Sequence, residues 1–226
     1  MFDRISETFT FFSRHWWGIG LIVWVFAAPS LMIDLLFDPP VSEVDEEGMP
    51  RLDLANGLVL AQAMVMIVLT PLSSIVLPLK IRAILNQQPM SVGEAVRLAI
   101  PLWFKSFVTL LLTGVIIFFG FMMFLFPGMY LMARLSYAPF YVAFEGASPM
   151  SALQRSMHAT RPDHWNLLGV LLVFWLLVIS AHGLLASGLE MMPAVSVLVQ
   201  FIIAPITALI TIAALRFFDL HHHTYQ

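Results

Sequence analysis

The chain has 226 residues, of which 60% are apolar and 11% are charged, and its formal net charge is −3. A soluble domain is about 45–50% apolar and about 25% charged, so this chain has too few charged side chains to cover a surface that faces water. The composition therefore excludes a soluble enzyme, a disordered tail and a nucleic-acid-binding protein with a basic stripe. Because there is no cysteine, disulfides, thiolate metal ligands and a cysteine nucleophile are excluded too. We expect an all-α integral membrane protein of one domain.

Six apolar stretches are long enough, or nearly so, to cross a bilayer as helices, which takes about 20 residues at about 1.5 Å each. The first is preceded by a segment with no net charge and continues as far as Phe37, so we expect it to be retained rather than cleaved as a signal peptide. Pro127-Gly128 predicts a tight hairpin between the third and fourth. The expected spans are residues 17–37, 54–79, 102–126, 128–144, 166–188 and 194–218.

The basic residues indicate the orientation of these spans. If both termini lie on one side of the membrane, only Arg51 lies on the other side, and Arg134 falls inside the fourth span. Acidic residues gather on that other side, between residues 38 and 53. Cytoplasmic loops carry an excess of Lys and Arg, so we expect a multi-pass protein with both termini in the cytoplasm. The basic residues on the cytoplasmic side are Arg4, Arg14, Lys80, Arg82, Arg97, Lys105, Arg155, Arg161 and Arg216.

The odd-numbered spans share a pattern that predicts three units of surface helix, span and return span. An amphipathic segment ending near a Trp precedes each of them, at Trp16-Trp17, Trp103 and Trp165, and Trp prefers the headgroup level. The second and third segments both begin Pro-Met-Ser, with Glu94 or Gln154 three residues after the serine, as in a capping box. In the first segment the apolar residues are spaced by three or four, which indicates one apolar helical face. They are Phe2, Ile5, Phe9, Phe12 and Trp16.

These amphipathic segments are expected to lie in the cytoplasmic interface, where a basic side chain near anionic lipid contributes about 1 kcal/mol. They either anchor the loops alone or also recognise membrane lipids. The candidate headgroup contacts are Lys80, Arg82, Arg97, Arg155 and Arg161.

Arg134 is the most informative polar residue. It lies six residues after Gly128, about 9 Å into the fourth span, where insertion of an arginine costs about 2.5–3.5 kcal/mol. Asp34, at a comparable depth, is the expected partner, and Glu190 is a weaker one. The arginine marks either a polar site for a lipid headgroup or a permeant, or a structural ion pair, or a side chain that reaches the interface past Tyr130.

Two further residues are candidate members of an intramembrane polar site. Glu145 ends the fourth span, where it is either part of a network with Arg155 or an ordinary residue of the interface. His182 lies near the outer end of the fifth span, as a proton relay or a hydrogen-bonded interior residue. The run from His221 to His223 lacks a further ligand that would complete a metal site, so a solvated tail is expected.

Four prolines interrupt the expected spans, and each frees a backbone carbonyl that the bundle must satisfy. Such positions occur in helices that line a substrate path and in membrane helices generally. Small residues at four-residue spacing in the sixth span indicate close helix packing. The prolines are Pro29, Pro71, Pro139 and Pro205, and the small pairs are Ala204 with Ala208 and Thr207 with Thr211.

The sequence contains none of the common catalytic or nucleotide-binding motifs, and no pair of intramembrane carboxylates is placed for acid–base catalysis. We expect neither an enzyme nor a cofactor.

Residues 88–172 resemble the YciC-like family of bacterial inner-membrane proteins and, more distantly, the membrane domain attached to some glycerophosphodiester phosphodiesterases. The resemblance implies a six-helix membrane fold in the bacterial inner membrane but no reaction, since the family has no settled one and this chain has no phosphodiesterase domain. Arg134 occupies a position that need not be charged in that family. The residues that carry the resemblance are Pro127-Gly128-Met129-Tyr130-Leu131, Arg134-Leu135, Ala138-Pro139, Glu145, the segment from Ser148 to Ser156, and Trp165.

Two hypotheses of function follow. The first is a non-enzymatic structural or accessory protein of the bacterial envelope, with membrane lipids and a membrane protein as partners. The second is a transporter or lipid-handling protein with a polar site around Arg134, near the membrane midplane.

Overall fold

The computed structural model describes residues 2–36, 57–88, 90–189 and 193–224, and within these ranges the chain is helical, without strands. The expected all-α fold class is confirmed. The helices are α1 (Phe2–Arg14), α2 (Trp16–Leu36), α3 (Gly57–Leu85), α4 (Val92–Ala99), the 3₁₀ turn η1 (Ile100–Leu102), α5 (Trp103–Met123), α6 (Leu125–Leu135), α7 (Ala138–Glu145), α8 (Pro149–Ala159), α9 (His164–Leu189) and α10 (Pro193–Thr224).

Two stretches of the described chain, Leu60–Leu85 and Val92–Met123, are long and apolar enough to cross a membrane. A third candidate is the pair formed by α8 and the first part of α9, which bends by 105° between the two helices. The described residues within 17–37, 166–188 and 194–218 are helical and belong to α2, α9 and α10; that these helices cross a membrane stays a prediction. The acidic segment 38–53, including Arg51, lies outside the described residues.

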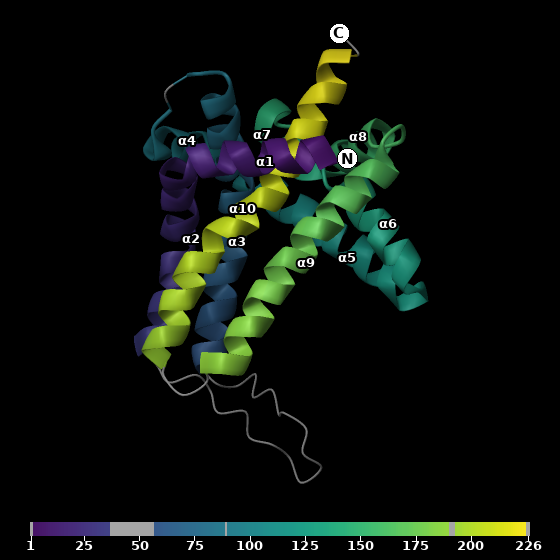
Figure 1. Cartoon of the computed structure of the whole chain (residues 1–226). Coiled ribbons are helices and arrows are strands. Elements are labelled where there is room, and N and C mark those ends of the chain that lie inside the picture. Colours follow the sequence, from purple (N-terminus) through teal and green to yellow (C-terminus); the bar gives the residue numbers. More distant parts are fainter. Residues whose placement is uncertain (1, 37–56, 89, 190–192, 225–226) are drawn as a thin grey trace.

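The amphipathic helices gather at one end of the molecule. Figure 1 shows α1, α4, α7 and α8 at the end where α10 terminates, whereas the tip of the α5–α6 pair points away to one side. The second of the three expected surface helices is α4. It differs from the prediction, because α4 continues through η1 into α5 as one membrane-length segment. The third expected surface helix, α8, is followed by a sharp turn before α9. The second and third units therefore share an order of elements but not a geometry.

The predicted fourth span, 128–144, is not one helix. It is divided between α6 and α7, which are separated at Ser136 and Tyr137. Pro139 explains the break, because it has no N–H for the carbonyl of Leu135 and can be accommodated only in the first turn of a new helix. Gly146 ends α7 in the left-handed conformation, with a φ of 62°.

The predicted hairpin at Pro127-Gly128 is displaced. The chain turns at Phe124, whose backbone is extended, and both Pro127 and Gly128 lie inside the first turns of α6. A proline near a helix N-terminus breaks no hydrogen bond, so it begins α6 instead of ending α5. Gly128 faces α5 there, with its Cα close to Gly120.

One of the two predicted capping boxes is present. Ser91 accepts from the backbone of Glu94, and Glu94 accepts from the backbone of Ser91, at the start of α4. The box at Ser151 and Gln154 was wrong, because α8 begins at Pro149 and both residues lie inside the helix. Proline at the first helical position is favourable in itself, and α8 begins three residues earlier than a cap at Ser151 would allow.

The buried face of α1 differs in part from the apolar face that the sequence predicts. Phe12 is buried as expected, but Phe9 is 50% exposed, and Thr8 and Phe11 complete the buried face. The side chains of Phe2 and Ile5 lie outside the described part of the structure. α1 therefore packs through a narrow stripe against α10.

The core lies next to the gathered helices and is rich in aromatic rings. Tyr137 and Phe218 are buried, with ring centroids 5.5 Å apart, and Phe140 packs against the same Phe218 ring at 5.6 Å. These contacts join α7 to α10 and fix the position of the broken fourth segment.

Candidate functional site

Arg134 lies in the last turn of α6 and is 95% buried (5% exposed). Its Nη2 donates a hydrogen bond to the carbonyl of Met157, and its guanidinium lies 5.6 Å from the ring centre of Tyr130. Met157 belongs to the last turn of α8, where helical carbonyls lack donors of their own and a cation is favourable. Arg134 therefore acts as a cap for the C-terminus of α8.

Two hydroxyl groups of α8 and its C-cap satisfy the backbone at the break between α6 and α7. Ser156 Oγ accepts from the N–H of Tyr137 at 3.1 Å and donates to the carbonyl of Arg134 at 2.8 Å. Thr160 Oγ1 donates to the carbonyl of Ser156 at 2.8 Å and lies 3.3 Å from the same Arg134 carbonyl. Both residues are fully or almost fully buried. Sequence reasoning missed this pair, since neither residue belongs to a recognisable motif.

Of the four residues of the predicted intramembrane site, the structure describes the side chains of Arg134 and Glu145. Glu145 ends α7 and forms an ion pair with Arg155 of α8, as one of its two interpretations anticipated. Asp34 and His182 belong to α2 and α9, but their side chains lie outside the described residues, as do Glu190 and the side chains of His221 to His223.

Three of the five candidate headgroup contacts have partners within the protein. Lys80 donates to the carbonyl of Met90, Arg82 lies 3.8 Å from Asp219, and Arg155 pairs with Glu145. Arg97 and Arg161, by contrast, are exposed and have no side-chain partner among the residues described. Arg14, at the end of α1, shares this property. Among the described residues, the arginines without a side-chain partner therefore lie on α1, α4 and the segment after α8.

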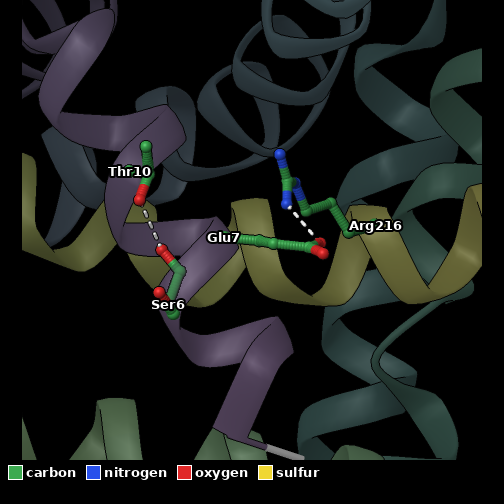
Figure 2. Close-up of polar contacts among 4 residues, drawn as sticks. All are labelled: Ser6, Glu7, Thr10 and Arg216. Carbon is green, nitrogen blue, oxygen red and sulfur yellow. Dashed lines mark hydrogen bonds and ion pairs between the residues drawn. The ribbon is translucent and has the colours of Figure 1, made fainter.

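An ion pair ties α1 to the end of α10. Figure 2 shows Glu7 of α1 pointing toward Arg216 of α10, with Oε2 and Nη1 3.0 Å apart. The Arg216 guanidinium also lies 5.4 Å from the ring centre of Phe11. On the same helix, Thr10 donates to the carbonyl of Ser6 at 2.8 Å, a bond that stays within α1. The first and last helices are thus adjacent.

A cavity of about 450 Å³ lies among α3, α5, α9, α10 and the break between α6 and α7. Its volume is within the range of about 300–1,000 Å³ that is typical of small-molecule sites. Among the described residues none that lines it is charged, although its wall carries several hydroxyl groups. Those groups belong to Thr70, Ser73, Ser74, Thr113, Ser136, Thr207 and Thr211.

Most of these hydroxyl groups have donated their hydrogen within the protein. Ser73, Ser136 and Thr207 each donate to the carbonyl three residues earlier, and Ser74 shares a hydrogen bond of 2.8 Å with Ser106 of α5. Thr113 differs, because its Oγ1 is buried and has no hydrogen-bond partner in the described chain. The described part of the wall is therefore uncharged and mainly apolar, with scattered hydroxyl groups that are only partly satisfied.

Comparison of the chain with protein-family models, with curated proteins and with solved structures gave no match.

Proposed function

We propose that this chain is a six-span protein of the bacterial inner membrane, with both termini in the cytoplasm and a non-enzymatic structural or accessory role. Its working surface is the cytoplasmic end of the bundle, formed by α1, α4 and α8. There the protein binds anionic lipid headgroups and presents a fixed platform to a membrane protein partner.

The distribution of paired and unpaired arginines is the observation that carries this proposal. Arg82, Arg155 and Arg216 are neutralised by acidic residues of the same chain. Arg97 and Arg161 are exposed and without side-chain partners among the described residues. They belong to α4 and to the segment directly after α8, and these two helices lie at the same end of the molecule. A cation held near an anionic membrane surface gains about 1 kcal/mol from the lipid. These two side chains can gain that energy without breaking a contact within the fold.

Further support comes from the apolar composition, from the membrane-length helices and from the excess of Lys and Arg at this end. The threefold order of surface helix, span and return span belongs to the proposal, as does the relation to the YciC-like family. The contacts of Arg134 favour a structural role over a transporter or lipid-handling site centred on it, because its Nη2 donates to the carbonyl of Met157 in α8, although its buried Nε has no hydrogen-bond partner among the described residues.

The test is lipid retention in native nanodiscs, read by mass spectrometry. We expect Arg97→Gln/Arg161→Gln to lose about 30-fold in preference for phosphatidylglycerol over phosphatidylcholine, from about 1 kcal/mol per arginine. The matched control is Arg155→Gln/Arg216→Gln, which removes the same charge from paired positions. Equal losses in both double variants would show that only total charge matters, and would overturn the assignment of these two residues.

The same preparation tests the accessory role and the topology. A protein that co-purifies reproducibly with the wild-type chain supports the accessory role, whereas bulk lipid alone contradicts it. Since the chain has no cysteine, single cysteines at Gly93 and Ser151 can be labelled from one side of sealed vesicles. Labelling of both from the periplasmic side would contradict the proposed orientation.

A further inference from the structure

We propose that the cavity among α3, α5, α9 and α10 binds the hydroxyl group of an uncharged lipid alcohol. This inference rests on the proposed insertion in a membrane and goes beyond the cytoplasmic platform. It concerns the interior of the bundle, and none of the candidate headgroup arginines lines the cavity.

The position of the cavity places it at the depth of lipid tails. Ser74 lies 11 residues before the end of α3 at Leu85, and Thr113 lies 10 residues after the start of α5 at Trp103. Because the expected span in α3 ends at residue 79, before Lys80 and Arg82, Ser74 lies about 8 Å inside a hydrocarbon core of about 30 Å, and Thr113 lies about 15 Å from the start of α5. Polar groups at this depth have little access to water, so they require partners from protein or lipid.

The wall offers mainly hydrogen-bond acceptors. Ser73, Ser136 and Thr207 have donated their hydrogens to carbonyls of their own segments, which leaves their oxygen lone pairs as acceptors. Pro78 has no N–H to offer the carbonyl of Ser74, and both residues line the cavity. The preferred ligand therefore donates hydrogen bonds.

The proline at the break between α6 and α7 adds another free acceptor. Pro139 leaves the carbonyl of Leu135 without its usual helical donor, and these two residues line the cavity as well. Thr113 supplies the complementary group, since its buried hydroxyl has no partner in the described structure. A rotation about its Cα–Cβ bond turns that hydroxyl toward a ligand.

The absence of charge in the lining selects against phospholipids. A phosphate in this cavity would meet no cation, because Arg134 is bonded to Met157 and is not in the wall. Burial of an unpaired charge is far more costly than burial of a hydroxyl that forms hydrogen bonds. Trp175, which lines the cavity, is 43% exposed, so this wall reaches the surface that would face lipid and gives a tail a route outward. A diacylglycerol and a polyprenol both satisfy these requirements.

The test uses a diacylglycerol with a photoreactive diazirine in one chain, in nanodiscs of phosphatidylglycerol. We expect labelled peptides from α3, α5 or α9, and competition by unlabelled diacylglycerol or by a polyprenol but not by phosphatidic acid of the same chains. Whichever alcohol competes better identifies the source of the ligand. Equal competition by phosphatidic acid would overturn the proposal.

Two pairs of variants locate the site. Thr113→Val removes a hydroxyl group and Pro78→Ala occupies a free carbonyl, and each should lower labelling about fivefold, the effect of one ordinary hydrogen bond. Pro78→Ala acts by restoring an N–H to the carbonyl of Ser74. The matched controls, Thr109→Val and Pro71→Ala, lie on the same helices outside the lining and should label like wild type. Equal labelling of all four variants would refute the assignment.

Misfolding and failure of the proposed function are both distinguishable from loss of this site. Thr113→Val replaces an unpartnered buried hydroxyl with a methyl group of the same shape, so its melting temperature without probe should equal or exceed that of wild type. A lowered melting temperature would contradict the assignment. Arg97→Gln/Arg161→Gln should leave the labelling unchanged, since neither residue lines the cavity.

Discussion

Helices α5 and α6 meet at two glycines, and replacement of one of them tests the packing directly. A Cβ atom on Gly120 would lie 3.0 Å from the Cα of Gly128 and 2.7 Å from Cδ1 of Leu131. Carbon atoms in favourable contact are about 3.5–4.0 Å apart. Leu131 can change its rotamer, but the backbone of Gly128 cannot move alone. In Gly120→Ala the two helices must therefore separate by about 0.5–1.0 Å.

The loss of stability in Gly120→Ala is estimated by comparison with a second glycine of the same helix. Overpacking of this kind costs about 1–3 kcal/mol, whereas replacement of a helical glycine by alanine gains about 1 kcal/mol from propensity. Gly114, also in α5, has nothing within 4 Å of a built Cβ, so Gly114→Ala receives the gain alone. Because the propensity term cancels, we expect Gly120→Ala to be about 1–3 kcal/mol less stable than Gly114→Ala.

The measurement is unfolding of both purified variants by titration with sodium dodecyl sulfate, followed by circular dichroism or tryptophan fluorescence. We expect Gly114→Ala to unfold at or above the wild-type midpoint and Gly120→Ala below it. Equal midpoints for the two variants would refute the close approach of α5 and α6 at Gly120 and Gly128.

Three further substitutions test the contacts between segments. Ser156→Ala leaves the N–H of Tyr137 without its acceptor, so unfolding should show a loss of about 1–3 kcal/mol, whereas Ser151→Ala on the same helix should stay within about 0.5 kcal/mol; equal effects would contradict the role of Ser156. Arg134→Met removes the cap of α8 and should speed amide exchange in its last turn, measured by mass spectrometry; unchanged exchange would argue against the cap. Glu7→Gln removes an exposed ion pair and should cost about 0.2–1 kcal/mol, a difference that should shrink in high salt; a difference that is independent of salt would argue against a charge effect.

The sequence predicted the helical class and the features that depend on nearby residues. The box at Ser91 and Glu94 needs only residues three apart, and its pattern was sufficient. The same pattern failed at Ser151, because Pro149 is favourable at the first helical position and starts α8 earlier. Pro127-Gly128 correctly indicated a turn nearby, but not that both residues would begin the following helix.

The candidate site was less predictable, because its partners are far apart in the sequence. Arg134 was recognised because insertion of an arginine into a membrane is energetically costly. Its partner is the backbone carbonyl of Met157, and every residue has such a carbonyl, so the sequence could not identify it. The break at Ser136 and Tyr137 depends on hydroxyl groups about 20 residues later. The polar groups of the cavity wall are single Ser and Thr residues on several helices. In the sequence, each of them alone is indistinguishable from an ordinary helical residue.

The support of the fourth segment by α8 has a consequence for biogenesis. The N–H of Tyr137 donates to Ser156, which lies 19 positions downstream and is synthesised later. At about 5–20 residues per second, a ribosome needs roughly 1–4 s to make that stretch. During this interval the nascent segment carries an unpaired amide and the charge of Arg134. If the fourth segment crosses the membrane as proposed, it should remain beside the insertion machinery, shielded from lipid, until α8 has been synthesised.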